Sequence, residues 1–502
     1  MKNINKYLRL SRKNLFDSDQ LSHDLSRRSI RGGVTTVTSR CVMVVMNILR
    51  TVVLARLLTP QDFGIVSMVS VIVGFAALFK DAGLSLATVQ KETISPGEIS
   101  TLFWLNIAIS IFVGLSIVAL APFISLFYNK PELTYVTIAL SLSVVIQGFG
   151  IQHAALLRRH MYFLTLGFIE IFSSIVGLSI AIFFALQGFN YWALVLSTIS
   201  ISIASVSLTY IFCPWIPNLP KRRTGARKML RFGMHVSGYN ILTYITQHVD
   251  QILIGKFIGP YGLGIYNRAH SVVQMPIFAI RKPIANVSVS AFSRIQNEPD
   301  KIKKYADKYV LIISFFSMPV MAFCFVYSES LILLLLGKNW DEVVPLFRIL
   351  SLAGFIQLPL TITSLLLVTC GKSQEYLRIG ILTSTFFLFF ISLGIMWGTT
   401  GVAFAYVAST YILSLPMLFY MSKHVPYTTK DFFTSIARPV FASVLSGLIF
   451  FHLPAPCFEL LFLNVLCSGL FFLFVFVLIF TSTPNGFSIL KNDIFSIVRH
   501  FK

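Results

Sequence analysis

The sequence predicts an all-α integral membrane protein, and three observations lead to this fold class. Of the 502 residues, 55% are hydrophobic and only 12% are charged, and the mean hydropathy is +0.77. Soluble domains carry about 25% charged residues, so this chain needs lipid as the solvent for much of its outer surface. The apolar residues also form long runs, and the basic residues lie mainly between these runs.

The apolar runs match the length of roughly 20 residues that a helix needs to cross the hydrocarbon core of a bilayer. We count fourteen such runs, and an even number places both ends of the chain on the same side of the membrane. The transmembrane helices are expected at 34–55, 62–83, 99–121, 133–153, 164–186, 190–213, 230–256, 262–283, 306–327, 343–369, 376–397, 401–421, 433–452 and 458–481.

The basic residues between the runs orient the helices. With both termini in the cytosol, the cytosolic loops contain most of the lysines and arginines, as the positive-inside rule requires. Residues 1–33 are basic and contain no apolar stretch typical of a cleavable signal peptide, so we expect a cytosolic tail there. The net charge of +21 therefore reflects these loops and indicates no nucleic-acid partner.

An internal repeat divides the predicted helices. Residues 55–65 and 255–265 share a small residue, a cation, two apolar residues, Pro, Gly and Ile in register. Both copies begin on the cytosolic side, so the repeat is parallel, with two lobes of six helices and two extra C-terminal helices. We expect a tail at 1–33, an N-terminal lobe at 34–213, a basic cytosolic linker at 214–229, a C-terminal lobe at 230–422, helices 13 and 14 at 433–481, and a cytosolic tail at 482–502.

The segment Leu-Ala-Arg-Leu-Leu-Thr-Pro-Gln-Asp-Phe-Gly at 54–64 carries a family resemblance. It resembles Wzx-type polysaccharide transporters, the colanic acid and lipopolysaccharide exporter branch of the multidrug/oligosaccharidyl-lipid/polysaccharide (MOP) superfamily. Lys-Asp-Ala-Gly-Leu at 80–84, Leu-Arg-Arg at 157–159 and Asp-Gln-Ile-Leu-Ile-Gly-Lys at 250–256 strengthen the resemblance. It covers about residues 30–485.

This resemblance implies a V-shaped bundle with a central cavity that opens alternately to the two sides of the bacterial inner membrane. The implied substrate is an undecaprenyl-diphosphate-linked oligosaccharide, moved from the cytosolic to the periplasmic leaflet for O-antigen, colanic acid or exopolysaccharide assembly. The implied partners are this substrate, membrane lipids, and the polymerase and assembly proteins of the same pathway. No cofactor is expected, although coupling to a proton or sodium gradient is left open.

The physical task restricts which residues bind the substrate. A diphosphate and its sugars lose several kcal/mol per polar group in hydrocarbon, so the protein must provide a wet cavity with positive charge. Arg40 and Arg50 lie about 15 Å apart along one helix and within roughly 80° of one face. Arg268 is a third candidate, because a guanidinium binds phosphate oxygens through two hydrogen bonds. Arg348 is a further candidate, and the alternative for each arginine is a structural or interfacial role.

Acidic and imidazole side chains within the spans are candidates for coupling or gating. Asp250 is the repeat equivalent of Arg50, so the two side chains could pair in one conformation and separate in the other. Alternatively, Asp250 binds a coupling cation, or it pairs locally with His248 or Lys256. His270 and Glu170 complete the candidates, and no spacing typical of a metal site is found.

Several other functions were weighed against transport of a lipid-linked glycan. The segment Gly-Lys-Ser at 371–373 lacks the first glycine of a phosphate-binding loop, which argues against an ATP-driven pump. A membrane polysaccharide polymerase or ligase is the alternative from another class, but the longest predicted outside loop, at 328–342, contains no catalytic constellation. We therefore expect no enzyme activity. A lipid II flippase and a cation-coupled drug exporter share the fold and stay as alternatives.

Overall fold

The computed structural model describes residues 25–81, 83–91, 94–220, 244–245, 247–296, 298–452, 461–484 and 486–491. These residues form helices and connecting turns and contain no β-strand. Ten of their segments are long and apolar enough to cross a membrane. The chain is therefore an all-α membrane protein. Parts of the predicted segments lie outside the described residues: 1–24 of the tail at 1–33, 221–229 of the linker at 214–229, 230–243 of the seventh span at 230–256, and 492–502 of the tail at 482–502.

The chain divides into two compact units, residues 1–264 and 265–502. The division falls near the start of α11 (Pro260–Arg294) and not in the predicted linker at 214–229. The cause is the helical segment 247–257, which precedes α11 and packs within the first unit. Within this segment Lys256 donates a hydrogen bond to the carbonyl of Phe127, and Tyr244, which precedes it, donates one to the carbonyl of Val71 at 2.9 Å. The predicted lobe boundaries stay a prediction.

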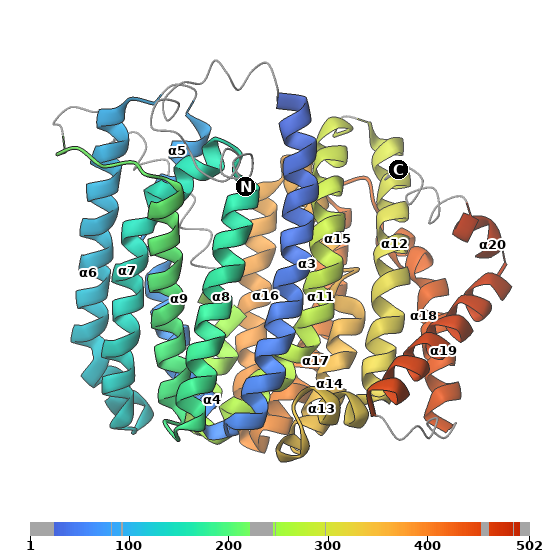
Figure 1. The fold of residues 1–502 in the computed structure, drawn as a ribbon. Helices are drawn as coiled ribbons and strands as arrows, with labels where there is room; N and C mark the ends of the chain where they lie inside the picture. Colours follow the sequence, from blue (N-terminus) through green and yellow to red (C-terminus); the bar gives the residue numbers. More distant parts are fainter. Residues whose placement is uncertain are drawn as a thin grey trace. The chain divides into compact units, whose positions relative to one another are not determined.

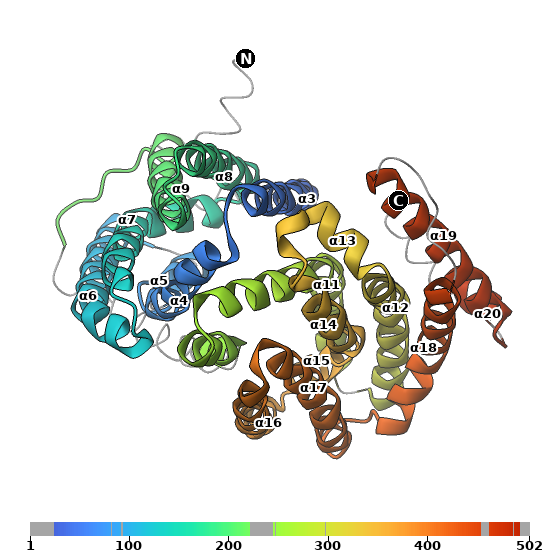
Figure 2. The same ribbon diagram turned by 90° about the horizontal axis from the view of Figure 1, so that it is seen from below.

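The first unit contains a helix at each span predicted between 34 and 213. In Figures 1 and 2, α6, α7, α8 and α9 stand side by side, and α8 also packs against α3. The second span, predicted at 62–83, corresponds to α4, which ends at Ala77, and a short helix α5 follows after the predicted end of the span. The helices are α3 (Leu25–Leu57), α4 (Pro60–Ala77), α5 (Leu84–Gln90), α6 (Pro96–Tyr128), α7 (Glu132–Arg159), α8 (Phe163–Leu186) and α9 (Tyr191–Phe212).

Capping explains why α4 and α6 begin where they do. The Thr59 hydroxyl accepts a hydrogen bond from the Asp62 amide at 3.4 Å, and the Asp62 carboxylate accepts one from the Thr59 amide at 2.9 Å. Ser95 and Glu98 form the same reciprocal pair at the start of α6. Each pair satisfies two amides that the first turn of a helix leaves without partners. The Thr-Pro-Gln-Asp segment of the family motif is therefore a helix start.

The two copies of the repeat motif touch each other inside the first unit. A Cβ atom on Gly64 would lie 2.9 Å from the Cα atom of Pro260, and one on Gly264 would lie 2.7 Å from the carbonyl carbon of Pro60. The carbonyl oxygens of both prolines would be closer still. Only glycine permits this approach of the two backbones, so each copy supplies one glycine and one proline to a reciprocal contact.

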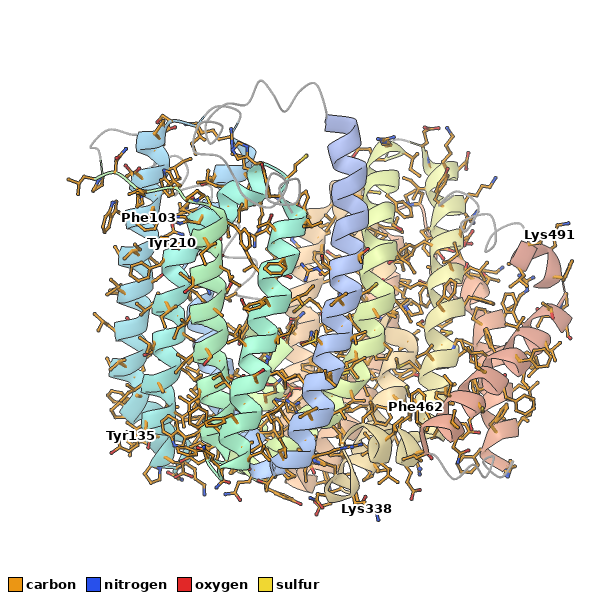
Figure 3. All side chains as sticks on the ribbon, viewed as in Figure 1. Phe103, Tyr135, Tyr210, Lys338, Phe462 and Lys491 are labelled. Atoms are coloured by element: carbon orange, nitrogen blue, oxygen red, sulfur yellow. The ribbon has the colours of Figure 1, made fainter. Side chains whose placement is uncertain are left out.

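The outer surface of the first unit is apolar, as lipid requires. On α6, Phe112, Leu115, Phe123 and Leu126 are between 64% and 72% exposed. Figure 3 shows Phe103 and Tyr210 towards one end of these helices and Tyr135 towards the other. Large exposed hydrophobic side chains on this scale would be costly in water, so this surface faces the bilayer.

The second unit contains helices at the predicted spans from 262–283 onward, with two differences. Residues 328–342, predicted as a loop, include α13 and η2, and the span at 343–369 is divided into α14 and α15. Figures 1 and 2 show α12, α18 and α19 packed side by side. The elements after α11 are α12 (Pro299–Val326), α13 (Ser328–Leu335), η2 (Lys338–Trp340), α14 (Val343–Gln357), α15 (Thr361–Thr369), α16 (Ser373–Gly394), η3 (Ile395–Trp397), α17 (Gly398–Ser422), α18 (Thr429–His452), α19 (Leu461–Ser482) and α20 (Gly486–Ile489).

Candidate functional site

The middle of α11 has a polar exposed face and an apolar buried face. Tyr266, Ala269, Val273 and Ile277 are all buried, with exposed fractions of 0–2%. The polar side chains of this stretch are partly exposed instead. Partly exposed polar side chains are costly in hydrocarbon, so we expect the face they form to border water. These side chains are Asn267, Arg268, His270, Ser271 and Gln274.

His270 and Gln274 on this face join side chains from two other helices. Gln274 Nε2 donates a hydrogen bond to Gln357 Oε1 at 3.4 Å and lies 3.4 Å from His270 Nε2. The His270 ring stacks on Tyr266, with centroids 6.1 Å apart, and meets the Tyr406 ring edge-on at 5.6 Å. We call His270, Gln274, Gln357 and Tyr406 the neutral cluster. It connects α11, α14 and α17.

The neutral cluster lies well inside the membrane-spanning helices. Gln274 is the fifteenth residue of the 35-residue α11, and Tyr406 is the ninth of the 25-residue α17. Gln357 is the last residue of α14, in the middle of the apolar segment Val343–Thr369. The helix is interrupted directly after it, because Pro359 has no amide to continue the hydrogen-bond ladder. Interrupted helices near the middle of a bilayer are typical of transporter binding sites.

The charge of this site is set by the composition of its helices. The segments α11, α14, α15 and α17 contain no aspartate or glutamate. Arg268 is two residues from His270, about 160° away around the helix axis, so it contributes positive charge to α11 on a different side from His270. The site therefore combines a cation with neutral hydrogen-bonding groups. The sequence identified Arg268 and His270 as candidates but missed Gln274, Gln357 and Tyr406.

In the first unit, Arg40 and Glu170 lie opposite each other on α3 and α8. Arg40 Nη1 is 4.0 Å from Glu170 Oε2, and the two side chains are 57% and 44% exposed. The helices approach closely here, because a Cβ atom on Gly167 would be 2.7 Å from the Cβ atom of Ser39. Two candidates that were predicted for different roles thus form one ion pair. Glu170 partly neutralises the charge of Arg40.

Arg50 differs from Arg40 in its surroundings. It is partly buried, and it forms no hydrogen bond or ion pair with any residue that the structure describes. Arg50 follows Ser39 by eleven residues, which is three full helical turns plus about 20°, so both side chains point to nearly the same side of α3. Because Ser39 lies against Gly167 of α8, Arg50 also lies on the α8 side of α3. A partly buried guanidinium without a protein partner is suited to an anionic ligand. Arg50 is therefore the strongest candidate cation of the first unit.

Asp250 is buried, with an exposed fraction of 1%, and its Oδ1 atom accepts a hydrogen bond from the Gln251 amide at 2.8 Å. No ion pair joins it to Arg50 among the described residues. The proposed exchange of this pair between two conformations stays a prediction.

Arg348 donates a hydrogen bond from Nε to the Ser328 hydroxyl at 2.9 Å, which connects α14 to α13. Its role in substrate binding also stays a prediction.

Comparison with known proteins decides the family. The family described as polysaccharide biosynthesis protein matches residues 53–345, more than half of the chain. The chain belongs to this family. The chain is also similar to individual proteins. The lipopolysaccharide biosynthesis protein WzxC of Escherichia coli K12 is 22% identical to it over 428 residues, which cover 84% of this chain and 86% of that protein. The teichuronic acid biosynthesis protein TuaB of Bacillus subtilis is 24% identical over 468 residues, 90% of this chain and 95% of TuaB.

Solved structures show the fold of this polysaccharide biosynthesis protein. The lipid II flippase MurJ in an inward closed conformation has a TM-score of 0.71 at 16% identity, covering 90% of this chain and 99% of MurJ. An inward-facing multidrug transporter of the MATE family of the MOP superfamily has a TM-score of 0.56 at 15% identity, covering 75% and 94%. The predicted Wzx-type MOP fold is confirmed. These relatives are transporters and flippases, not enzymes.

Proposed function

We propose that this chain is a flippase that moves a polyprenyl-diphosphate-linked oligosaccharide from the cytosolic to the outer leaflet of the bacterial inner membrane. Both termini then lie in the cytosol. The observation that carries the proposal is the partly exposed polar face of α11, which sits among membrane-spanning helices of a polysaccharide biosynthesis protein. Such a face has no use in lipid, and it suits a polar cargo that must pass through the bilayer.

The charged groups suit the diphosphate of such a cargo. Arg50 and Arg268 are guanidinium groups within the long helices α3 and α11, and guanidinium groups bind phosphate oxygens through two parallel hydrogen bonds. Arg40 contributes less to the proposed site, because Glu170 competes for its charge. The polyprenyl chain stays in the lipid, while the diphosphate and sugars use the wet path.

Alternating access would complete the transport cycle. The site opens to the cytosol, accepts the glycolipid, and then opens to the other side, as expected for the MOP superfamily. A proton or sodium gradient could drive this cycle through Asp250 or His270. We propose that the enzymes which polymerise and assemble the glycan consume the translocated product.

Cells that lack this gene provide the test. Polyprenyl lipids are extracted and analysed by mass spectrometry, together with surface polysaccharide. We expect a complete lipid-linked repeat unit to accumulate and surface polysaccharide to be lost. The wild-type gene should restore both, Arg50→Lys should restore them partly, and Arg50→Ala should not.

Two outcomes would contradict the proposal. Unchanged lipid intermediates with normal surface glycan would exclude this role, and accumulation of lipid II instead would favour the lipid II flippase. Export of cationic drugs is the weaker alternative, because the helices around the neutral cluster contain no acidic residue to attract a cation.

A further inference from the structure

We propose that the neutral cluster of His270, Gln274, Gln357 and Tyr406 is a carbohydrate-binding subsite that holds the sugar part of the cargo. This inference rests on the proposed function and assigns a separate task to each kind of side chain. Cations bind the diphosphate, and the neutral cluster binds hydroxyl groups. All four residues belong to the second unit, residues 265–502.

The hydrogen-bonding groups of the cluster are only loosely engaged with each other. The contacts of Gln274 Nε2 with Gln357 Oε1 and with His270 Nε2 are both 3.4 Å long. This is longer than the 2.7–3.2 Å of a typical N–H···O bond. A side-chain amide offers two donors and an acceptor with two lone pairs, so Gln274 and Gln357 retain capacity for a ligand. Hydroxyl groups of a sugar both donate and accept, and they match this mixture.

The aromatic part of the cluster provides a surface for a sugar ring. Tyr406 is partly exposed, and its ring is fixed on two sides by edge contacts with His270 at 5.6 Å and with Phe387 at 5.6 Å. Tyr266 is buried, and its ring stacks on one face of the His270 imidazole and holds that ring in place. A tyrosine ring has an apolar face that packs against the C–H groups of a pyranose while its edge stays polar. Aromatic walls with a few convergent polar groups are typical of small-ligand sites.

The helix interruption after Gln357 changes the backbone hydrogen bonds beside the cluster. Pro359 cannot donate to the carbonyl of Phe355, which would be its partner in a continuous helix. The chain closes this turn with shorter bonds, from the Thr361 amide to the Leu358 carbonyl at 3.0 Å and from the Ile362 amide to the Pro359 carbonyl at 3.2 Å. The carbonyl of Phe355 therefore cannot accept the hydrogen bond that residue 359 would donate in a continuous helix.

The absence of carboxylates distinguishes a sugar from an ion. A sodium ion or a cationic drug is normally held by at least one acidic side chain, and α11, α14, α15 and α17 provide none. A phosphate would require a cation within the cluster, and its four members carry no permanent positive charge. A neutral polyhydroxy ligand satisfies the donors, the acceptors and the aromatic surface together.

Binding to purified full-length protein in lipid nanodiscs tests this inference. One probe is the lipid-linked oligosaccharide extracted from the deletion strain, and the other is farnesyl diphosphate, which has the diphosphate but no sugar. We expect Gln274→Ala and Tyr406→Ala each to weaken binding of the glycolipid at least fivefold. Both variants should bind farnesyl diphosphate within twofold of the wild type, which also shows that they are folded.

Phe404→Ala is the matched control. Phe404 lies two residues from Tyr406 on α17, is 57% exposed, and makes none of the ring contacts of the cluster. It should leave both affinities unchanged. If the wild type binds the glycolipid and both cluster variants bind it equally well, or if they lose both probes to the same extent, the carbohydrate subsite is disproved while the flippase function stands. If the wild type does not bind the glycolipid at all, the proposed function itself fails.

Discussion

Two arginines on one helix illustrate how much the surroundings of a charge decide its role. Arg40 and Arg50 were both candidates by sequence, since both interrupt an apolar run. The structure pairs Arg40 with Glu170 at 4.0 Å and gives Arg50 no partner among the described residues. Because a charge with a protein partner is less available to a ligand, the two substitutions should differ in effect.

Arg50→Ala should weaken binding of farnesyl diphosphate about 10- to 100-fold, since a charge-assisted hydrogen bond is worth about 1.5–3 kcal/mol. Arg50→Lys should recover part of this loss, because lysine keeps the charge but not the planar pair of donors. Arg40→Ala is the control on the same helix, and its effect should be several times smaller. Equal effects of the two alanine variants would show that Arg50 has no special role.

Glu170→Gln removes the partner of Arg40 without removing bulk. Both side chains are about half exposed, and such ion pairs contribute about 0–1 kcal/mol. We therefore expect the thermal unfolding midpoint of the purified protein to change little and transport in cells to continue. Loss of transport with an unchanged midpoint would instead identify Glu170 as a coupling residue.

Sequence alone identified the charged part of the site and only His270 of the neutral cluster. A charge inside an apolar run is rare enough to be noticed, as with Arg50 and Arg268. Glutamine and tyrosine occur in many membrane helices, so Gln274, Gln357 and Tyr406 carry no signal individually. Only the fold brings residues 83 positions apart, such as Gln274 and Gln357, into contact.

At the scale of elements, the starts of α4 and α11 show why the family motif contains glycine. Gly64 and Gly264 lie against Pro260 and Pro60, and a side chain on either glycine would overlap the opposing backbone. The repeat was visible in the sequence as a shared pattern. The contact between its two copies was not, because sequence similarity between two segments does not predict that they touch.

Gly64→Ala should therefore destabilise the protein or displace one of the two helices. We expect a thermal unfolding midpoint several degrees lower in detergent, since overpacking typically costs about 1–3 kcal/mol. Gly380→Ala is the matched control, because a Cβ atom there would meet nothing within 4 Å and Gly380 lies inside α16. Its midpoint should stay the same or rise slightly. The contact is unimportant if both variants behave alike.

The helix start at Thr59 allows a milder test of the same element. Thr59→Ala removes the hydroxyl that accepts from the Asp62 amide and should cost about 1 kcal/mol. Thr59→Ser keeps this hydroxyl and should retain most of the stability. The comparison of their thermal midpoints measures the capping interaction directly, and an equal loss in both variants would assign the effect to the lost methyl group instead.

Apolar runs predicted where helices lie but not where they are interrupted. The breaks at 78–83 and 358–360, and the short α13, fall within or beside apolar sequence, and the length of a run does not record them. Pro359 was a visible signal for the second break. α13 was missed because its polar first turn, Ser-Glu-Ser at 328–330, is typical of a loop and also of a helix N-terminus.

At the scale of the whole molecule, composition and the family motif were sufficient for the fold class and the family. The division of the chain into units was not predictable in the same way, because it depends on which helices the segment 247–257 packs against. The central claim of our account is that this protein carries a lipid-linked oligosaccharide across a bilayer, with Arg50 as a binding cation and a wet face on α11.

Purified protein in liposomes tests this claim most directly. Lipid-linked oligosaccharide from the deletion strain is incorporated, and a membrane-impermeant glycosidase added outside measures how much of it reaches the outer leaflet. We predict that wild-type protein exposes nearly all of the glycan with time, whereas liposomes with Arg50→Ala expose little more than the half already outside. If wild-type liposomes stop at the same half as protein-free ones under every ion gradient tested, the account is wrong.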